Sequence, residues 1–278
     1  NVEDDKINFE STKKIVDIVK SNPQKLKNFV FISTIGAVDR HKDDAFAAPL
    51  TTASVPAPTT QYGKSKLKSE QYIKVSGLPF TIIRPTWVYG KNMRENSHIN
   101  KFVSLVYSKS PFHRFNFPGR VSMIYVGDLV DSMVGCIDHE KIIGKTYFAG
   151  TEAESIGGIF KIIYKEIYSE DVKQLPVPRV FQSITKKVHH KIPLTAANLF
   201  VDYLFADGEE FMQDFRIHKP VKFRDGVNEV IHTNNSVFKQ VAKYKKIGFG
   251  FFGAWLKHSL YPISFFKQIL PKQGIIVD

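Results

Sequence analysis

This chain of 278 residues contains a single cysteine, Cys136. One thiol excludes an internal disulfide framework and a cysteine-rich zinc site, and it is typical of a reducing compartment. The first twenty residues, NVEDDKINFESTKKIVDIVK, are charged and contain no apolar run, so no signal peptide is visible. We therefore expect a cytoplasmic protein. Because the chain begins with Asn rather than Met, we also expect it to be an N-terminally truncated fragment.

The whole chain is basic, with a net charge of +12, and residues 230–277 contain no Asp or Glu. Lysines and aromatic residues are interspersed there: Lys239, Lys243, Lys245, Lys246, Lys257, Lys267 and Lys272 with Phe249, Phe251, Phe252, Trp255, Tyr261, Phe265 and Phe266. This composition favours a peripheral membrane contact over a nucleic-acid partner, and a helix pair with solvated lysines is the alternative. Charged residues and Pro262 interrupt the apolar run, which argues against a membrane-spanning helix.

The hydrophobic pattern predicts helices and strands in alternation. Helical spacing covers residues 7–20, 62–75 and 155–167, and short apolar runs typical of buried strands cover residues 29–33, 80–85 and 146–150. Residues 121–137 indicate a strand that leads into a helix, residues 39–60 a long loop, and the chain after residue 175 a mainly helical region. This order predicts an α/β fold with a parallel sheet.

The segment TQYGKSKLKSE places Tyr62 and Lys66 four residues apart, on one face of the predicted helix. Chance produces about one Tyr-x-x-x-Lys match in a chain of this composition, so an ordinary basic helix is the alternative to a catalytic pair. A neighbouring ammonium favours the phenolate and lowers the pKa of a phenol from its usual ~10, so such a tyrosine can exchange a proton with an alcohol oxygen.

Such chemistry also needs a hydroxyl that holds the substrate oxygen. Ser33 and Thr34 follow the predicted strand 29–33 at its carboxyl end, where open α/β sheets bind their ligands. The segment RPTWVYG ends the next predicted strand at the same edge. The sequence therefore predicts that hydroxyls from one strand end lie close to the tyrosine helix.

Four segments in this order resemble consecutive landmarks of the extended short-chain dehydrogenase/reductase superfamily, which includes the NAD-dependent epimerase/dehydratase group. They are FVFISTIGAV, PTTQYGKSKLKSEQYI, LPFTIIRPTWVYG and IYVGDLV. The resemblance covers residues 5–150. It implies a Rossmann-like parallel sheet whose nicotinamide side lies in residues 1–150, and a smaller, mostly helical substrate domain with the basic tail in residues 151–278.

The resemblance also implies roles for individual residues. Tyr62 is the expected catalytic acid and base, Lys66 holds the nicotinamide ribose and tunes Tyr62, and Thr34 binds the substrate oxygen, with Ser33 as the alternative. The expected contacts with the nicotinamide are Pro85, Thr86 and Val88, and Tyr62 and Thr34 are also expected to contact the cofactor. Asn8, in the Asn position of the family's Asn-x-x-Gly-Thr helix start, is expected near the cofactor or as a bridge between backbone groups.

This sequence departs from the family pattern because no Gly-x-x-Gly-x-x-Gly turn precedes Tyr62. That turn presents backbone N–H groups to the pyrophosphate of the dinucleotide. The expected cofactor is NAD or NADP. The family residues that discriminate between the two are expected, like the glycine-rich turn, ahead of the first residue of this chain, so both cofactors stay open. A non-catalytic relative, a scaffold or a membrane-associated subunit that keeps the fold, is the alternative function.

A second departure concerns the substrate. Sugar-nucleotide members of the family usually carry an Asn in the region where this chain has Trp87. A large apolar side chain there favours a less polar carbonyl or alcohol compound, so both substrate classes stay open. Related enzymes often form dimers through helices that include the tyrosine helix, so a homodimer is also an open prediction.

The remaining polar candidates carry weaker signals. Asp128 in VGDL is expected to cap the helix that follows it. Arg114 and Arg120 are predicted either to meet a substrate phosphate or to be solvated in a loop. The histidines His41, His98, His113, His189 and His190 show no metal-ligand spacing, and we expect no metal site.

Overall fold

The structure is a computed structural model that describes residues 5–22, 26–40, 46, 48–94, 97–192 and 194–233. The predicted membrane-contact segment, residues 239–278, lies outside the described residues. The chain divides into two compact units, each built from several segments. The first comprises residues 1–91, 120–154 and 202–230, and the second residues 92–119, 155–201 and 231–278. Part of the region after residue 150 therefore belongs to the first unit, so one cut there does not separate the units.

The first unit contains a parallel sheet with the strand order β1–β2–β6. The three strands are β1 (Phe29–Ile32), β2 (Phe80–Pro85) and β6 (Thr146–Ala149). Both strand pairs are parallel, with Phe29 opposite Phe80 and Ile82 opposite Thr146. The parallel α/β sheet predicted from the sequence is confirmed, with its apolar runs at the predicted places.

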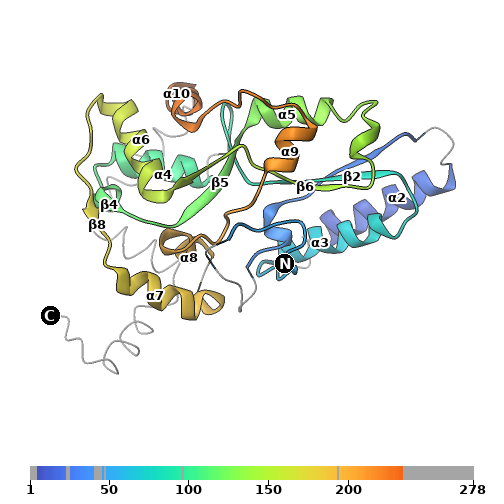
Figure 1. Ribbon diagram of the computed structural model, residues 1–278, viewed down its shortest axis with the longest axis horizontal. Helices are drawn as coiled ribbons and strands as arrows, with labels where there is room; N and C mark the ends of the chain where they lie inside the picture. The colour runs from blue at the N-terminus through green and yellow to red at the C-terminus, as the bar shows by residue number, and fades with distance from the viewer. Residues whose placement is uncertain are drawn as a thin grey trace. The chain divides into compact units, whose positions relative to one another are not determined.

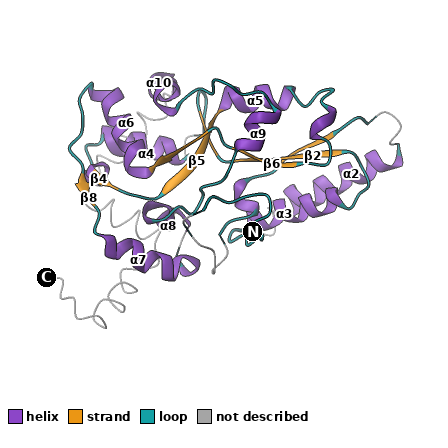
Figure 2. Ribbon diagram, in the orientation of Figure 1, coloured by secondary structure: helices purple, strands orange, loops and turns teal. Residues whose placement is uncertain are grey.

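Helices cover both faces of this sheet, as Figures 1 and 2 show. On one face lie α2 (Ser11–Ser21) and α3 (Gln61–Lys74), and on the other lie α5 (Val126–Val134) and α9 (Glu209–Asp214). Adjacent residues of β2 point to opposite faces, as strand geometry requires. Ile82 packs with Val16 and Ile73 of α2 and α3, whereas Ile83 packs with Leu129 and Phe211 of α5 and α9. Both faces of the sheet are therefore buried, which explains the continuous apolar sequence of β2.

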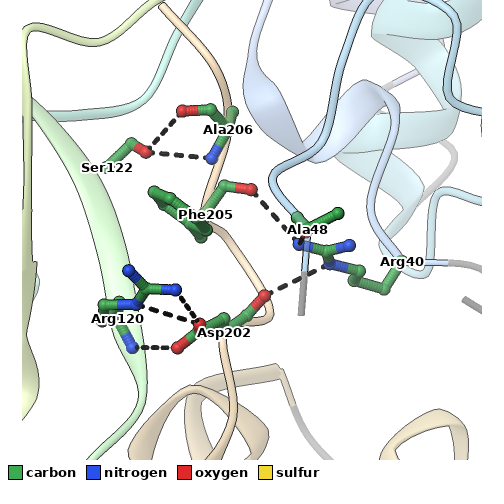
Figure 3. Close-up of polar contacts among 7 residues, drawn as sticks. All are labelled: Arg40, Ala48, Arg120, Ser122, Asp202, Phe205 and Ala206. Carbon is green, nitrogen blue, oxygen red and sulfur yellow. Dashed lines mark hydrogen bonds and ion pairs between the residues drawn. The ribbon is translucent and has the colours of Figure 1, made fainter. Parts of the chain in front are cut away.

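A second sheet of the first unit has the order β3–β5–β7, with strands β3 (Trp87–Tyr89), β5 (Arg120–Tyr125) and β7 (Glu152–Ser155). The segment 202–207 runs beside β5 and ties it to the loop that follows β1. Figure 3 shows two anchors of this segment: Ser122 Oγ exchanges hydrogen bonds with Ala206, and Arg120 binds the Asp202 carboxylate. The helix α10 (Phe223–Thr233) follows.

The second unit is mainly helical. Its helices include α4 (His98–Tyr107), α6 (Ile156–Tyr168), α7 (Arg179–Val188) and α8 (Leu194–Phe200). Of these, α7 and α8 lie in the region after residue 175 that was predicted to be mainly helical. Shorter elements are the 3₁₀ helices Pro111–Arg114 and His189–Lys191 and the strand pair β4 (Phe115–Asn116) and β8 (Leu175–Pro176). Aromatic rings of α4 and α6 form its core, with the ring centroids of Phe102 and Phe160 4.8 Å apart.

Three short helical turns complete the first unit: a π-helical turn, Asp5–Glu10, and 3₁₀ turns at Ile35–Ala37 and Glu140–Ile142. The predicted helix 7–20 thus begins with a π turn, which contains Asn8. Such turns are frequent at functional sites. Within the described residues no helix is both long enough and apolar enough to cross a membrane.

Candidate active site

The first turn of α3 carries Tyr62. Thr60 caps the helix, since its hydroxyl accepts a hydrogen bond from the Gly63 N–H at 3.0 Å. This cap satisfies one of the free N–H groups of the first turn and fixes where the helix begins. The side chain of Tyr62 is 44% exposed, so its phenol lies at the surface of the first unit rather than in the core.

Gly63 brings α3 against the turn after β1. A Cβ atom on Gly63 would lie 2.1 Å from the carbonyl oxygen of Gly36, a backbone atom that cannot rotate away. Gly36 follows Thr34 by two residues, and Thr34 Oγ1 accepts a hydrogen bond from its N–H at 3.2 Å. The absence of a side chain at Gly63 therefore allows the tyrosine helix to approach the strand end that carries Thr34.

Lys66 reaches from α3 to the end of β1. Its Nζ donates a hydrogen bond to the carbonyl oxygen of Ile32 at 2.9 Å. The same nitrogen lies 4.7 Å from the ring centroid of Phe31 and 5.9 Å from that of Tyr62. Burial lowers the pKa of Lys66, and the carboxylate of Glu70, one helical turn further on, opposes that shift. The predicted pair thus shares one face of the helix.

The two predicted hydroxyls differ in their partners. Ser33 is buried, and its hydroxyl donates to Glu70 Oε1 at 2.5 Å. Thr34 is half-buried and caps the turn Ile35–Ala37, where its oxygen acts as the acceptor. A hydroxyl that accepts a hydrogen bond keeps its proton for another partner. Thr34 can therefore donate to a ligand oxygen while it caps the turn, whereas the proton of Ser33 is already used.

A buried ion pair beside these residues was not predicted from the sequence. Glu70 and Arg84 are 1% and 4% exposed, and Arg84 donates to both carboxylate oxygens of Glu70, at 2.9 and 2.6 Å. Glu70 follows Lys66 by four residues, so the face shared by Tyr62 and Lys66 continues to Glu70. This repeated spacing was the available signal, because it places Glu70 on the same side of the helix as the other two residues.

The other predicted cofactor contacts lie at the ends of neighbouring strands. Pro85 ends β2, and Thr86 donates from both its N–H and its hydroxyl to the Ala149 carbonyl, at the end of β6. Trp87 and Val88 are half-buried in β3. Asn8 lies elsewhere, in the π turn, where its carbonyl accepts hydrogen bonds from Thr12 and from Ser69 of α3. That contact makes Asn8 a backbone bridge to the tyrosine helix.

A second buried carboxylate, Asp39, holds the loop before α3. Its backbone has φ of 48°, its Oδ2 accepts from both the N–H and the hydroxyl of Thr59, and its Oδ1 has no hydrogen-bond partner. Burial raises the pKa of Asp39. Because Thr59 directly precedes the helix cap Thr60, Asp39 helps to fix the start of the tyrosine helix. Nothing in the sequence pattern distinguished this aspartate.

Two of the weaker expectations need correction. Asp128 does not cap α5, because Tyr125 is the cap residue and the Asp128 carboxylate accepts from the N–H of Val221 at 3.0 Å. Arg120 is not solvated in a loop, since it begins β5 and binds Asp202 at 2.6 Å (Figure 3). No group of three His, Cys, Asp or Glu side chains is arranged to hold a metal ion in the described part of the chain.

Comparison with known proteins places this site in a family. A model of the NAD dependent epimerase/dehydratase family matches residues 3–150, which include every residue of the site described above. The chain belongs to this family. The resemblance to extended short-chain dehydrogenases/reductases is confirmed, and with it the assignment of the sheet as Rossmann-like.

Individual relatives agree with the family. UDP-glucose 4-epimerase of Vibrio cholerae is 30% identical over 167 residues, and the match covers 55% of this chain and 47% of the relative. This chain thus spans about half the length of the curated relative that it matches. UDP-glucuronic acid 4-epimerase of Bacillus cereus, crystallised with UDP-glucuronic acid and NAD, has a TM-score of 0.61 at 18% identity, covering 84% of this chain and 68% of that one.

Two further structures share the fold at low sequence identity. UDP-glucose 4-epimerase of Thermotoga maritima, with UDP-glucose, has a TM-score of 0.61 at 18% identity and covers 87% of this chain and 72% of its own. dTDP-glucose 4,6-dehydratase of Bacillus anthracis, in complex with NAD, has a TM-score of 0.60 at 15% identity, and the match covers 84% of this chain and 70% of the dehydratase chain. At these identities the likeness establishes the fold.

Proposed function

We propose that this protein is an NAD(P)-dependent epimerase, dehydratase or dehydrogenase that moves a hydride at a hydroxyl-bearing carbon, with Tyr62 as acid and base. The observation that carries the proposal is the position of Lys66. Its amine is held by the Ile32 carbonyl at the end of β1 and lies 5.9 Å from the Tyr62 ring centroid. An ammonium at that position favours the phenolate of Tyr62, which is the form that accepts a proton.

The proton path involves residues of this chain alone. The phenolic oxygen of Tyr62 removes the proton of the substrate hydroxyl as the hydride leaves its carbon, and returns it in the reverse step. Thr34 donates a hydrogen bond to the same substrate oxygen, because its proton is not required by the turn that it caps. Ser33 is less suited, since it donates to Glu70.

The residues of this chain fit the nicotinamide side of a dinucleotide. Lys66 presents an amine donor for ribose hydroxyls. Pro85 and Thr86 lie buried at the carboxyl end of β2, and Val88 lies half-buried within β3. When bound, the nicotinamide supplies the acceptor and donor for the hydride. The glycine-rich turn expected for the pyrophosphate has no counterpart ahead of Tyr62 in this sequence. Residues 120–154 and 202–230 extend this proposed cofactor unit beyond the early part of the chain.

A sugar nucleotide is the substrate class that we favour. The supporting observation is the 30% identity to a UDP-glucose 4-epimerase, because that match extends over 167 residues. Trp87 supports the alternative, a less polar carbonyl or alcohol compound, because its indole adds apolar surface beside the proposed site. The homodimer and the membrane contact of the tail stay predictions.

The test uses the full-length protein with NAD and NADP in turn. UDP-glucose, UDP-glucuronic acid and dTDP-glucose form one set of substrates, and apolar secondary alcohols form the other. We expect reduced nicotinamide or an epimerised or dehydrated sugar with at least one sugar nucleotide. Turnover with the apolar alcohols alone would instead support a less polar carbonyl or alcohol compound as the substrate. Dinucleotide binding without turnover of any compound would favour the non-catalytic scaffold.

A further inference from the structure

The ion pair between Glu70 and Arg84 is more deeply buried than its stabilising effect explains. The exposed fractions of the two side chains are 1% and 4%. The free-energy cost of moving two charges out of water is similar to the free energy gained from their attraction. A protein in which apolar residues of similar volume replace a buried ion pair is therefore often equally stable. Arg84 also has one nitrogen, Nη1, without a hydrogen-bond partner. Fold stability alone therefore does not account for the pair.

The pair joins three elements at one place. Glu70 belongs to α3, Arg84 to β2, and Ser33, which donates to Glu70 Oε1, follows β1. Lys66, one turn earlier in α3, holds the carbonyl of Ile32. Two consecutive residues at the end of β1 are thus held by two consecutive turns of the tyrosine helix. This arrangement fixes both the rotation of α3 and its position along the strand end.

We propose that Glu70 is a positioning residue for the reaction of Tyr62: together with Arg84 and Ser33, it holds α3 so that the Lys66 ammonium stays beside the Tyr62 ring. This inference rests on the function proposed above. The charge of Glu70 contributes as well as its hydrogen bonds, because burial lowers the pKa of Lys66 and the Glu70 carboxylate opposes that effect. Arg84 donates to both oxygens of the same carboxylate.

The charge role and a purely structural role predict different results for two variants. Glu70→Gln keeps the shape of the side chain and removes the charge, but leaves Arg84 without its partner. Glu70→Leu/Arg84→Met removes both charges and fills the space with apolar side chains. Glu10→Gln is the matched control, because Glu10 is an exposed glutamate at the end of the π turn that packs beside α3.

Two measurements are made on each variant of the full-length protein. The first is the pKa of Lys66, from the NMR titration of ¹³C-methylated lysines, with the Lys66 signal assigned by its absence in Lys66→Arg. The second is kcat and KM over a range of pH, accompanied by urea unfolding. We expect both Glu70 variants to lower the Lys66 pKa, and to lower kcat more than about tenfold with KM within about twofold.

The double variant decides between the two roles. We expect it to recover the unfolding midpoint of the parent protein while its kcat and Lys66 pKa stay low. Recovery of kcat together with stability would overturn the proposal and leave the pair as a structural contact. An unchanged Lys66 pKa in the folded Glu70 variants would also overturn it, even if the parent protein showed no turnover. Failure of the proposed function can therefore be distinguished from failure of this inference.

Discussion

The close contact between Gly63 and Gly36 gives a prediction whose sign separates two physical effects. Gly63 lies in the first turn of α3, and helix propensity alone predicts that alanine there stabilises the protein by up to about 1 kcal/mol. The structure predicts the opposite. A new Cβ would lie 2.1 Å from the Gly36 carbonyl oxygen and 3.0 Å from its carbonyl carbon. Both are backbone atoms, so the helix itself must move.

Overpacking of this kind costs about 1 to 3 kcal/mol, and we expect Gly63→Ala to lower the free energy of unfolding by that amount. Gly36→Ala is the matched control on the other side of the contact, because its nearest neighbour would be Thr34 Oγ1 at an ordinary 3.7 Å. Its change should stay within about 0.5 kcal/mol. Urea unfolding with equal m-values measures both variants. A Gly63→Ala protein as stable as the parent would refute the close approach of α3 to the strand end.

Two further predictions test groups around the site. Burial raises the pKa of Asp39 above its unfolded value of 3.8, so its proton-linked stability is present at low pH and is lost as pH rises through the folded pKa. Asp39→Asn should therefore gain stability over the parent as pH rises from about 4 to 7, by about 1.4 kcal/mol for each unit of the shift, and parallel pH profiles in urea unfolding would contradict this. Arg40 is buried and donates to the carbonyls of Ala48, Asp202 and Phe205 (Figure 3), so Arg40→Met should cost about 2 to 3 kcal/mol. Arg120→Met changes a side chain that is 44% exposed, and it should lower the free energy of unfolding by less than about 1 kcal/mol. Equal losses in the two variants would contradict the claim that the buried Arg40 contributes more to stability than Arg120.

The central strands and the tyrosine helix were predictable because their signals are local. The strands β1 and β2 are continuous apolar runs, and the helical spacing from Tyr62 onward marks the helix α3. The order of these segments also identified the family. The same segments placed Lys66 and the strand-end hydroxyls within one small region, which the structure bears out in the contacts of Lys66 with Ile32 and of Gly63 with Gly36.

Other features depend on contacts between residues far apart in the sequence. A glutamate in a lysine-rich helix usually lies on a solvated face, and only the tertiary structure brings Arg84 of β2 to Glu70. The orphaned carboxylate oxygen of Asp39 depends in the same way on the fold around it. Residues 202–230 return to the first unit because Leu204 pairs with Val121 of β5 and Ala206 pairs with Leu50. The sequence of this segment has no pattern that predicts these pairings.

The most direct test of the account is a single-turnover measurement of hydride transfer in full-length protein that carries Tyr62→Phe. This change removes one hydroxyl from a residue that is 44% exposed, so the unfolding midpoint should stay close to the parent value. The rate at which the substrate reduces the bound nicotinamide should fall by about 100-fold or more, the usual contribution of a general acid or base. A Tyr62→Phe protein that reduces the nicotinamide at the parent rate would contradict the central claim that Tyr62 moves the proton.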